Sequence, residues 1–179
     1  RKTNKDYTGG KLDELTDIMI EKGTTLFVCA VGVPPRYMVE KLHSAGIVVM
    51  NMVGAVKHVK KALSVGVDLV CCQGGEGGGH TGEVGSTVLW PDIVDAVAPL
   101  PVLAAGGIGN GRQMLGAMAM GAAGVWTGSL WLTVEEAHAQ PAQKQTLLDA
   151  GVEDTVRTKA WTGKGARVFA SGGVPCRSA

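Results

Sequence analysis

The chain alternates two patterns of hydrophobic and polar positions. In one, apolar residues recur every three or four positions, which is typical of a helix with one buried face. In the other, short runs are apolar at nearly every position, which is typical of a strand buried on both faces. The first pattern predicts helices at 12–22, 36–45, 55–65, 90–98, 112–120 and 134–148. The second pattern predicts strands at 24–30, 47–50, 67–72, 101–105 and 124–127.

Glycines mark the ends of four of these predicted helices. Gly23, Gly46, Gly66 and Gly121 each stand where a helix needs a residue in the left-handed conformation to end it. Helices that alternate with two-sided apolar strands indicate a parallel sheet covered by helices, here an α/β fold of about five βα units. Either a doubly wound sheet or a (β/α)8 TIM barrel fits this order.

Small residues at the strand ends favour the barrel over the doubly wound sheet. Glycine, alanine or serine follows each of five consecutive predicted strands, as expected on the rim of a barrel where ligands bind. A complete barrel takes about 250 residues, and this chain has 179. We therefore expect an incomplete barrel over residues 1–168 and an irregular tail over 169–179.

Composition narrows the classes of partner. The net charge of +1 gives no reason to expect nucleic acid or an anionic membrane, and no apolar run reaches the roughly 18 residues of a membrane span. The four cysteines follow neither a metal-site spacing nor a disulfide pattern, which is typical of a reducing compartment. We expect a cytoplasmic protein without a bound metal, and the first residue, Arg1, suggests that the true N-terminus is missing.

The most distinctive segment is the glycine-rich stretch 73–82, which holds His80 and follows a predicted strand. A histidine in such a loop can simply be a satisfied polar residue. Histidine as a residue type can change its charge near neutral pH, however, and can take a proton from a substrate carbon. We expect His80 to be a catalytic base, whereas surface positions explain His43, His58 and His138.

A second glycine cluster, 104–111, follows the next predicted strand but lacks the G-x-G-x-x-G spacing of dinucleotide-binding proteins. Gly107, together with Gly128 and Ser129 one unit later, offers backbone N–H groups for a phosphate. Barrel phosphate sites often use the loops after strands 7 and 8. The alternatives are that Gly107 only makes a tight turn, and that the nearby Trp126 packs between strand and helix instead of lining a cofactor.

At these residues the chain resembles a known family. The run Gln73-Gly-Gly-Glu-Gly-Gly-Gly-His80-Thr-Gly is similar to the Q-G-x-E-A-G-G-H-x-G motif of the nitronate monooxygenases, formerly called 2-nitropropane dioxygenases. Residues 104–112 are similar to their A-A-G-G-I-x-x-G-R, and 124–129 to their G-V-x-x-G-T. The resemblance runs from about Asp6 to about Arg167. Two departures are Gly77 in place of alanine and Ser129 in place of threonine.

The resemblance implies a longer FMN-binding TIM barrel, of which this chain matches the C-terminal half or so. It implies that His80 is the catalytic base beside the flavin. It implies FMN contacts at Gln73, Gly78, Gly107, Trp126, Thr127, Gly128 and Ser129, with Gly107, Gly128 and Ser129 on the phosphate.

The activity that the resemblance implies is oxidation of a small alkyl nitronate, or a nitroalkane, with O2 to a carbonyl compound and nitrite. The main alternative is the related FMN-dependent enoyl-acyl-carrier-protein reductase, which uses NAD(P)H. A third possibility is an inactive barrel fragment that binds FMN weakly or not at all. The sequence leaves the physiological substrate and the oligomeric state open.

Overall fold

A computed structural model of the chain describes residues 8–160 and 162–170. Its main element is a parallel sheet of five strands in the order β1-β2-β3-β5-β6. These strands are β1 (Leu26–Cys29), β2 (Val48–Val53), β3 (Leu69–Gln73), β5 (Val102–Ala105) and β6 (Gly124–Trp126). Each strand pairs in parallel with the one before it in this order, as consecutive units of a barrel do.

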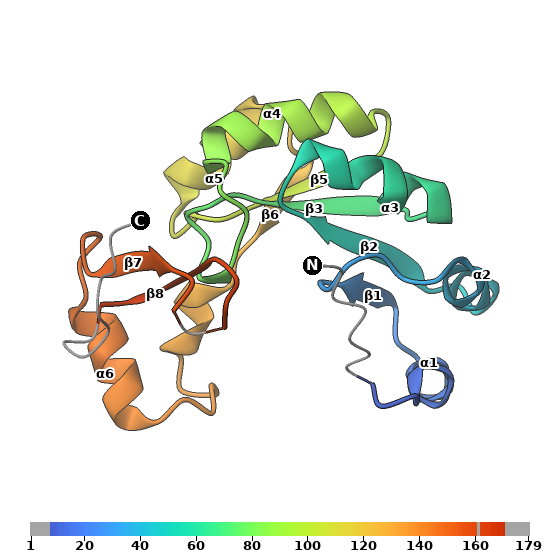
Figure 1. Cartoon of the computed structure of the whole chain (residues 1–179), viewed down its shortest axis with the longest axis horizontal. Coiled ribbons are helices and arrows are strands. Elements are labelled where there is room, and N and C mark those ends of the chain that lie inside the picture. The colour runs from blue at the N-terminus through green and yellow to red at the C-terminus, as the bar shows by residue number, and fades with distance from the viewer. Residues whose placement is uncertain (1–7, 161, 171–179) are drawn as a thin grey trace.

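Helices line the outer side of this sheet, which curves like an arch (Figure 1). They are α1 (Leu12–Glu21), α2 (Arg36–Ser44), α3 (Val59–Val65), α4 (Ser86–Val97) and α5 (Gly111–Ala119). A sixth helix, α6 (Pro141–Asp149), lies apart from this sheet and has no buried residue (Figure 1). Two short 3₁₀ helices, η1 (Val56–His58) and η2 (Ser129–Leu132), lie in the connections. The four helix-ending glycines adopt the expected left-handed backbone, with φ of 68° at Gly23, 73° at Gly46, 89° at Gly66 and 93° at Gly121.

The sheet is apolar on both faces. The larger core lies between the strands and the helices and includes Leu42, Val49, Val70 and Ile93. The opposite, concave face carries a smaller cluster of Met50, Cys71 and Ala105, with Val28, Met52, Leu69 and Leu103 packed against it. The five parallel strands with alternating helices confirm the prediction of an incomplete (β/α)8 TIM barrel.

The sequence did not predict the second sheet, which is antiparallel. It contains β4 (Gly79–His80), β7 (Thr155–Thr158) and β8 (Ala166–Phe169) in the order β4-β8-β7. Gly79 pairs with Arg167 and His80 pairs with Ala166. The glycine-rich segment is therefore not wholly a loop, because its histidine belongs to a two-residue strand that is paired with the end of the described chain.

Two predicted helices were wrong in extent. The helix predicted at 134–148 begins only at Pro141, because proline in a helix interior removes a hydrogen bond and clashes with the preceding turn, whereas the first helical position tolerates it. The helix predicted at 90–98 begins four residues earlier, at Ser86, and Pro91 lies inside it. At the other end of the chain, Phe169 is the last residue of β8, and residues 171–179 lie outside the described part. The domain division after residue 168 stays a prediction.

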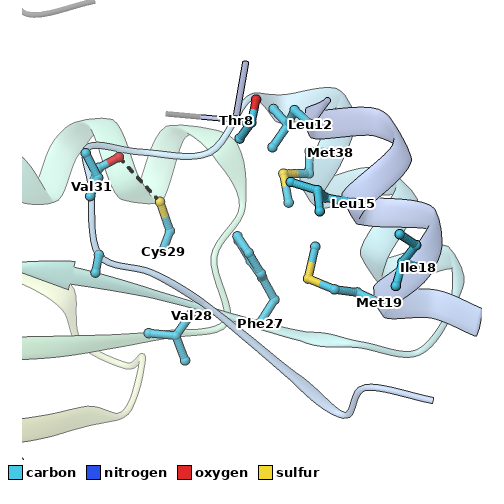
Figure 2. A pocket seen from close by; sticks show the side chains of 11 residues that line it. Thr8, Leu12, Leu15, Ile18, Met19, Phe27, Val28, Cys29, Val31 and Met38 are labelled. Atoms are coloured by element: carbon cyan, nitrogen blue, oxygen red, sulfur yellow. Dashed lines mark hydrogen bonds between the residues drawn. The ribbon is translucent and has the colours of Figure 1, made fainter. Parts of the chain in front are cut away.

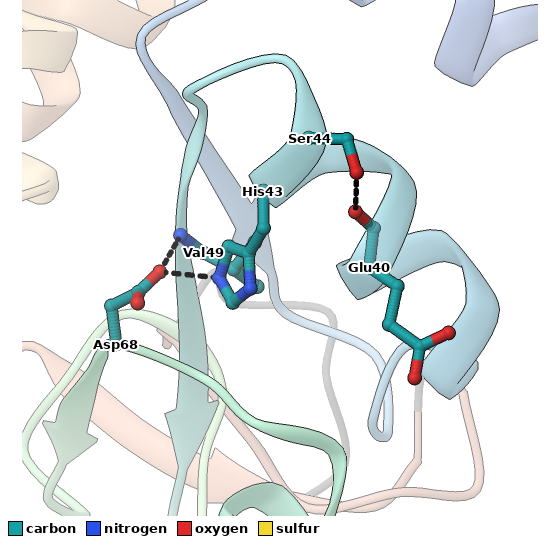
Figure 3. A network of polar contacts seen from close by, with 5 residues as sticks. All are labelled: Glu40, His43, Ser44, Val49 and Asp68. Atoms are coloured by element: carbon teal, nitrogen blue, oxygen red, sulfur yellow. Dashed lines mark hydrogen bonds and ion pairs between the residues drawn. The ribbon is translucent and has the colours of Figure 1, made fainter.

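Two features belong to the framework rather than to the glycine-rich loops. An apolar cavity of about 430 Å³ lies between α1 and β1, where Leu12, Met19 and Phe27 point toward one another (Figure 2). At the amino-terminal ends of β2 and β3, the Asp68 carboxylate accepts a hydrogen bond from the backbone N–H of Val49 (2.7 Å) and contacts His43 (2.9 Å, Figure 3). The contact of Asp68 lies at the opposite strand ends from the two glycine-rich loops, whereas the cavity reaches Cys29 and Val31 at the carboxyl end of β1, two strands away from β3.

Candidate functional site

The carboxyl ends of β3, β5 and β6 bring the predicted site residues onto one face. The strand register pairs Gln73 with Ala105, and Ala105 with Trp126. Paired residues of a sheet point to the same side, and Ala105 belongs to the concave cluster. Gln73 and Trp126 therefore lie on the concave face, on either side of a small alanine, and Trp126 is 37% exposed.

The first glycine loop is held against helix α4 and the second glycine loop. A Cβ on Gly74 would stand 2.1 Å from Ser86 Oγ and 2.5 Å from Ser86 Cα. The hydroxyl of Ser86, which is buried, lies 2.7 Å from a carboxylate oxygen of Glu76 and 2.9 Å from the carbonyl oxygen of Gly106. The Glu76–Ser86–Gly106 contact, called the latch below, thus joins the two glycine loops.

Glu76 also completes the start of α4. The same carboxylate oxygen accepts the backbone N–H of Ser86 at 2.8 Å, which is the first amide of a helix whose own N-cap residue supplies no side-chain bond. Partial burial pushes the pKa of Glu76 upward. The hydrogen bonds from Ser86 and the positive charge of Arg167 outweigh that effect, so the pKa lies below its ordinary value.

The second glycine loop exposes backbone donors. Gly106 and Gly107 both have positive φ, 97° and 72°, and a Cβ on Gly106 would lie 2.9 Å from the carbonyl oxygen of Gly74. The amides of Gly107 and Gly128 donate no hydrogen bond to another described residue, and both glycines are exposed. Free, exposed amides on adjacent strand ends are a suitable cradle for an anion such as phosphate.

Two further predicted residues meet across the loops. A Cβ on Gly78 would lie 2.6 Å from Ser129 Oγ, so Ser129 lies close to the backbone of the histidine-bearing loop, and a side chain at Gly78 would require this hydroxyl to rotate away. Thr127 Oγ1 accepts a hydrogen bond of 2.9 Å from the indole N–H of Trp131, which fixes the start of η2. Gln73 lies beneath the same loop, with its amide nitrogen 2.9 Å from where a Cβ on Gly77 would be.

His80 is exposed on β4, and its Nε2 lies 2.7 Å from the hydroxyl oxygen of Thr162. Neither neighbouring carboxylate reaches the ring. Glu76 is bonded to Ser86, and Glu83 pairs with Arg157 at 3.4 Å. The only described partner of the imidazole is therefore a hydroxyl from the β7–β8 hairpin.

The sequence missed the residues that hold the site together. Glu76 and Ser86 had no local signal as a pair, because the carboxylate lies ten residues before the serine amide that it accepts. Thr162 had no local signal, because it reaches His80 across 82 residues of sequence. Among the described residues there is no group of three or more His, Cys, Asp or Glu that could hold a metal. In the same part of the chain, no helix is both long enough and apolar enough to span a membrane.

A sequence model of the nitronate monooxygenases matches residues 6–174, nearly the whole chain. The chain belongs to the nitronate monooxygenase family. A Mycobacterium tuberculosis relative named as a monooxygenase, Rv1533, is 48% identical over 155 residues, which are 87% of this chain and 41% of that protein. A Rhodococcus jostii relative is 41% identical over 153 residues, 86% of this chain and 43% of the relative. Its name is (3aS,4S,5R,7aS)-5-hydroxy-7a-methyl-1-oxo-octahydro-1H-indene-4-carboxyl-CoA dehydrogenase.

Solved structures of the family share this architecture. The nitroalkane oxidase from Streptomyces ansochromogenes superposes with a TM-score of 0.82 at 28% identity, covering 89% of this chain and 49% of that structure. FabK from Thermotoga maritima gives a TM-score of 0.81 at 32% identity, covering 91% and 52%. By family and by fold, the chain is thus similar to oxidoreductases. The chain spans less than half the length of the two relatives named above.

Proposed function

We propose that this chain forms the flavin-binding part of an FMN-dependent enzyme that oxidises alkyl nitronates, and nitroalkanes, with O2 to a carbonyl compound and nitrite. The observation that carries the proposal is the arrangement at the carboxyl ends of β3, β5 and β6. The free amides of Gly107 and Gly128 lie on adjacent strand ends, and Ser129 touches the loop that bears His80. Family membership supports the same chemistry.

The residues present fit a phosphate-bearing flavin. The phosphate of FMN would be held by the amides of Gly107 and Gly128 and by the Ser129 hydroxyl, because these donors are exposed and have no other described partner. Gln73 and Trp126 would line the concave face beside it. FMN, when bound, supplies the redox chemistry, and the protein supplies binding, orientation and the proton acceptor.

The role proposed for His80 is general base. A neutral nitroalkane must lose its α-proton before it can be oxidised, whereas a nitronate has already lost it. The imidazole is exposed at the rim, where a substrate carbon can reach it. A base that titrates near neutral pH contributes about 10²- to 10⁴-fold to such a step.

A second candidate is a reductase or dehydrogenase, such as the FMN-dependent enoyl-acyl-carrier-protein reductase considered from the sequence. The Rhodococcus jostii relative, which is named as a dehydrogenase, favours this class. Oxidation of NADH or NADPH by the flavin-loaded protein, without a nitronate, would support it. A chain that binds no flavin at all would support the third candidate, an inactive barrel fragment.

Flavin binding tests the phosphate cradle. Titration of the chain with FMN and with riboflavin, followed by flavin fluorescence, should give far tighter binding of FMN. Gly107→Val should remove that preference, because its Cβ would lie 3.2 Å from Glu76 and its φ of 72° is strained for valine. The matched control is Gly109→Val in the same loop, where the nearest contact of a Cβ is 3.7 Å. Equal affinity of the parent chain for FMN and riboflavin would refute the phosphate assignment.

Substrate comparison tests His80. In the flavin-loaded protein, His80→Asn should depress turnover of neutral nitroalkanes by about 10²- to 10⁴-fold and spare preformed nitronates. Flavin content should not change, because His80 is not among the proposed phosphate ligands. Equal loss on both substrates with flavin retained would mean that His80 serves binding, and that another group takes the proton.

A further inference from the structure

We propose that Thr162 is a positioning residue for His80. It holds the imidazole with the proton on Nε2 and leaves Nδ1 as the nitrogen that accepts a proton from substrate. The role of Nδ1 as proton acceptor rests on the proposed function, whereas the position of the proton on Nε2 is a property of the chain itself. The contact between the two side chains is short, with 2.7 Å between Nε2 and Oγ1.

The hairpin that carries Thr162 forms hydrogen bonds with both ends of the histidine-bearing loop. Arg167 donates from Nε to the carbonyl oxygen of Gly75 at 3.1 Å. Arg157 donates to the carbonyl oxygen of Thr81 at 3.1 Å, and the Thr81 amide donates to Gly165 at 3.2 Å. These bonds hold both ends of the loop to one hairpin. The contact between His80 and Thr162 is therefore part of a larger set of bonds between the hairpin and the loop.

The guanidinium groups of Arg157 and Arg167 lie within the contact between the hairpin and the histidine-bearing loop. Arg157 and Arg167 face each other across β7 and β8, and the side chain of Arg157 is only 25% exposed. A Cβ on Gly165 would lie too close to the guanidinium of Arg157, so a side chain at this position would displace Arg157 from its bond to the loop. The position of Thr162 relative to His80 is thus set by backbone bonds on both sides.

The contacts of Thr162 favour the tautomer with the proton on Nε2. A hydroxyl can donate one hydrogen and accept two. The Lys164 carbonyl oxygen lies 3.5 Å from Thr162 Oγ1 and is the available acceptor, and the Lys164 amide donates to Oγ1 at 3.4 Å. All three positions are filled when His80 Nε2–H supplies the second donor. The opposite tautomer would use the hydroxyl hydrogen on Nε2 and leave one accepting position empty.

This arrangement suits a base that must change its charge. When Nδ1 takes the α-proton, the C–H bond breaks and its electron pair stays with the substrate as the nitronate. The Nε2–H bond to Thr162 is present before and after that transfer, since both ring nitrogens of a charged histidine are donors. The imidazole therefore keeps its orientation while it gains the proton.

Nitrogen-15 NMR of the histidine side chains tests the placement in this chain without cofactor or substrate. Nε2 of His80 should be the protonated nitrogen in the parent and in Thr162→Ser. In Thr162→Val, the ratio of the two tautomers should shift by about five- to tenfold toward that of a free histidine, which corresponds to one lost hydrogen bond. The matched control is Thr158→Val in the same hairpin. It removes a hydroxyl whose one bond to a described residue, Ala160, lies within its own turn.

Two results would overturn the inference. One is an NMR spectrum of the parent chain in which Nδ1 of His80 carries the proton. That measurement does not depend on whether any variant folds. The other is an unchanged tautomer ratio in Thr162→Val. In the flavin-loaded protein, Thr162→Val should also lower turnover of neutral nitroalkanes by about tenfold and spare nitronates, with recovery in Thr162→Ser. Absence of any nitronate turnover in the parent would contradict the proposed function, while the NMR result would still decide the role of Thr162.

Discussion

Replacing Gly74 with alanine probes the closest contact in the site. The new methyl group would meet Ser86 Oγ at 2.1 Å, Ser86 Cα at 2.5 Å and Ser86 N at 2.7 Å. Ordinary carbon contacts lie at about 3.5 to 4.0 Å. Because two of the three atoms belong to the backbone, no side-chain rotation relieves the overlap, and the start of α4 must move by about 1 Å.

The cost follows from two effects. Overpacking of this kind costs about 1 to 3 kcal/mol. Movement of Ser86 also weakens its bonds to Glu76 and Gly106, and each hydrogen bond contributes about 1 kcal/mol. The expected loss in the free energy of unfolding is about 3 kcal/mol or more, which corresponds to a fall in Tm of roughly 6 to 12 °C for a chain of this size.

Urea unfolding, followed by tryptophan fluorescence, measures this loss. Trp90 is a suitable reporter, because it is buried and donates to the carbonyl oxygen of Ala105 at the edge of the site. The control is Gly116→Ala in α5, where a Cβ meets nothing within 4 Å and alanine should stabilise the helix by about 1 kcal/mol. A Gly74→Ala variant within 1 kcal/mol of the parent, measured beside a control that behaves as expected, would refute the latch geometry.

Two other measurements address single groups. Burial raises the pKa of the Cys71 and Cys72 thiols to about 12, so neither should react with iodoacetamide in the native chain at neutral pH, as peptide mass spectrometry can check. Labelling of either before unfolding would contradict that burial. Because the pKa of Glu76 is held below its ordinary value of 4.5, its stabilising contribution is present above that pH and is lost as the pH falls through the folded-state pKa. The stability difference between the parent and Glu76→Gln should therefore shrink in acid, and a difference that stays constant would exclude the latch carboxylate as its source.

Sequence reasoning succeeded where local physics decides the structure. Helix ends at Gly66 and Gly121 and the two-sided apolar strands were predictable, because a left-handed glycine and an unbroken apolar run act within a few residues. The apolar runs that precede Gly107 and Gly128 likewise predicted that both glycines follow strands, and the structure has them there. Their assignment to a phosphate stays a prediction.

Sequence reasoning failed where contacts between distant segments decide the structure. The strands β7 and β8 have four residues each and no alternation of apolar and polar positions, so nothing nearby marks them as strands. Only β8 pairs with His80, and Arg157 and Arg167 from β7 and β8 bond to the backbone of the loop beside it. The early start of α4 was missed for a related reason, since the residue that completes its first turn, Glu76, lies outside the helix.

The pairing of β4 with β8 also implies an order of assembly. Neighbouring strands of the parallel sheet are close in sequence, as with Val49 and Asp68, which are 19 residues apart, whereas His80 and Thr162 are separated by 82. Closing a longer loop costs more chain entropy, so the sheet can form before the histidine is placed. In native-state hydrogen exchange, the Thr81 amide should then open with the hairpin and independently of the sheet. The placement of His80 would be the last step in the assembly of this fold and the first to be lost.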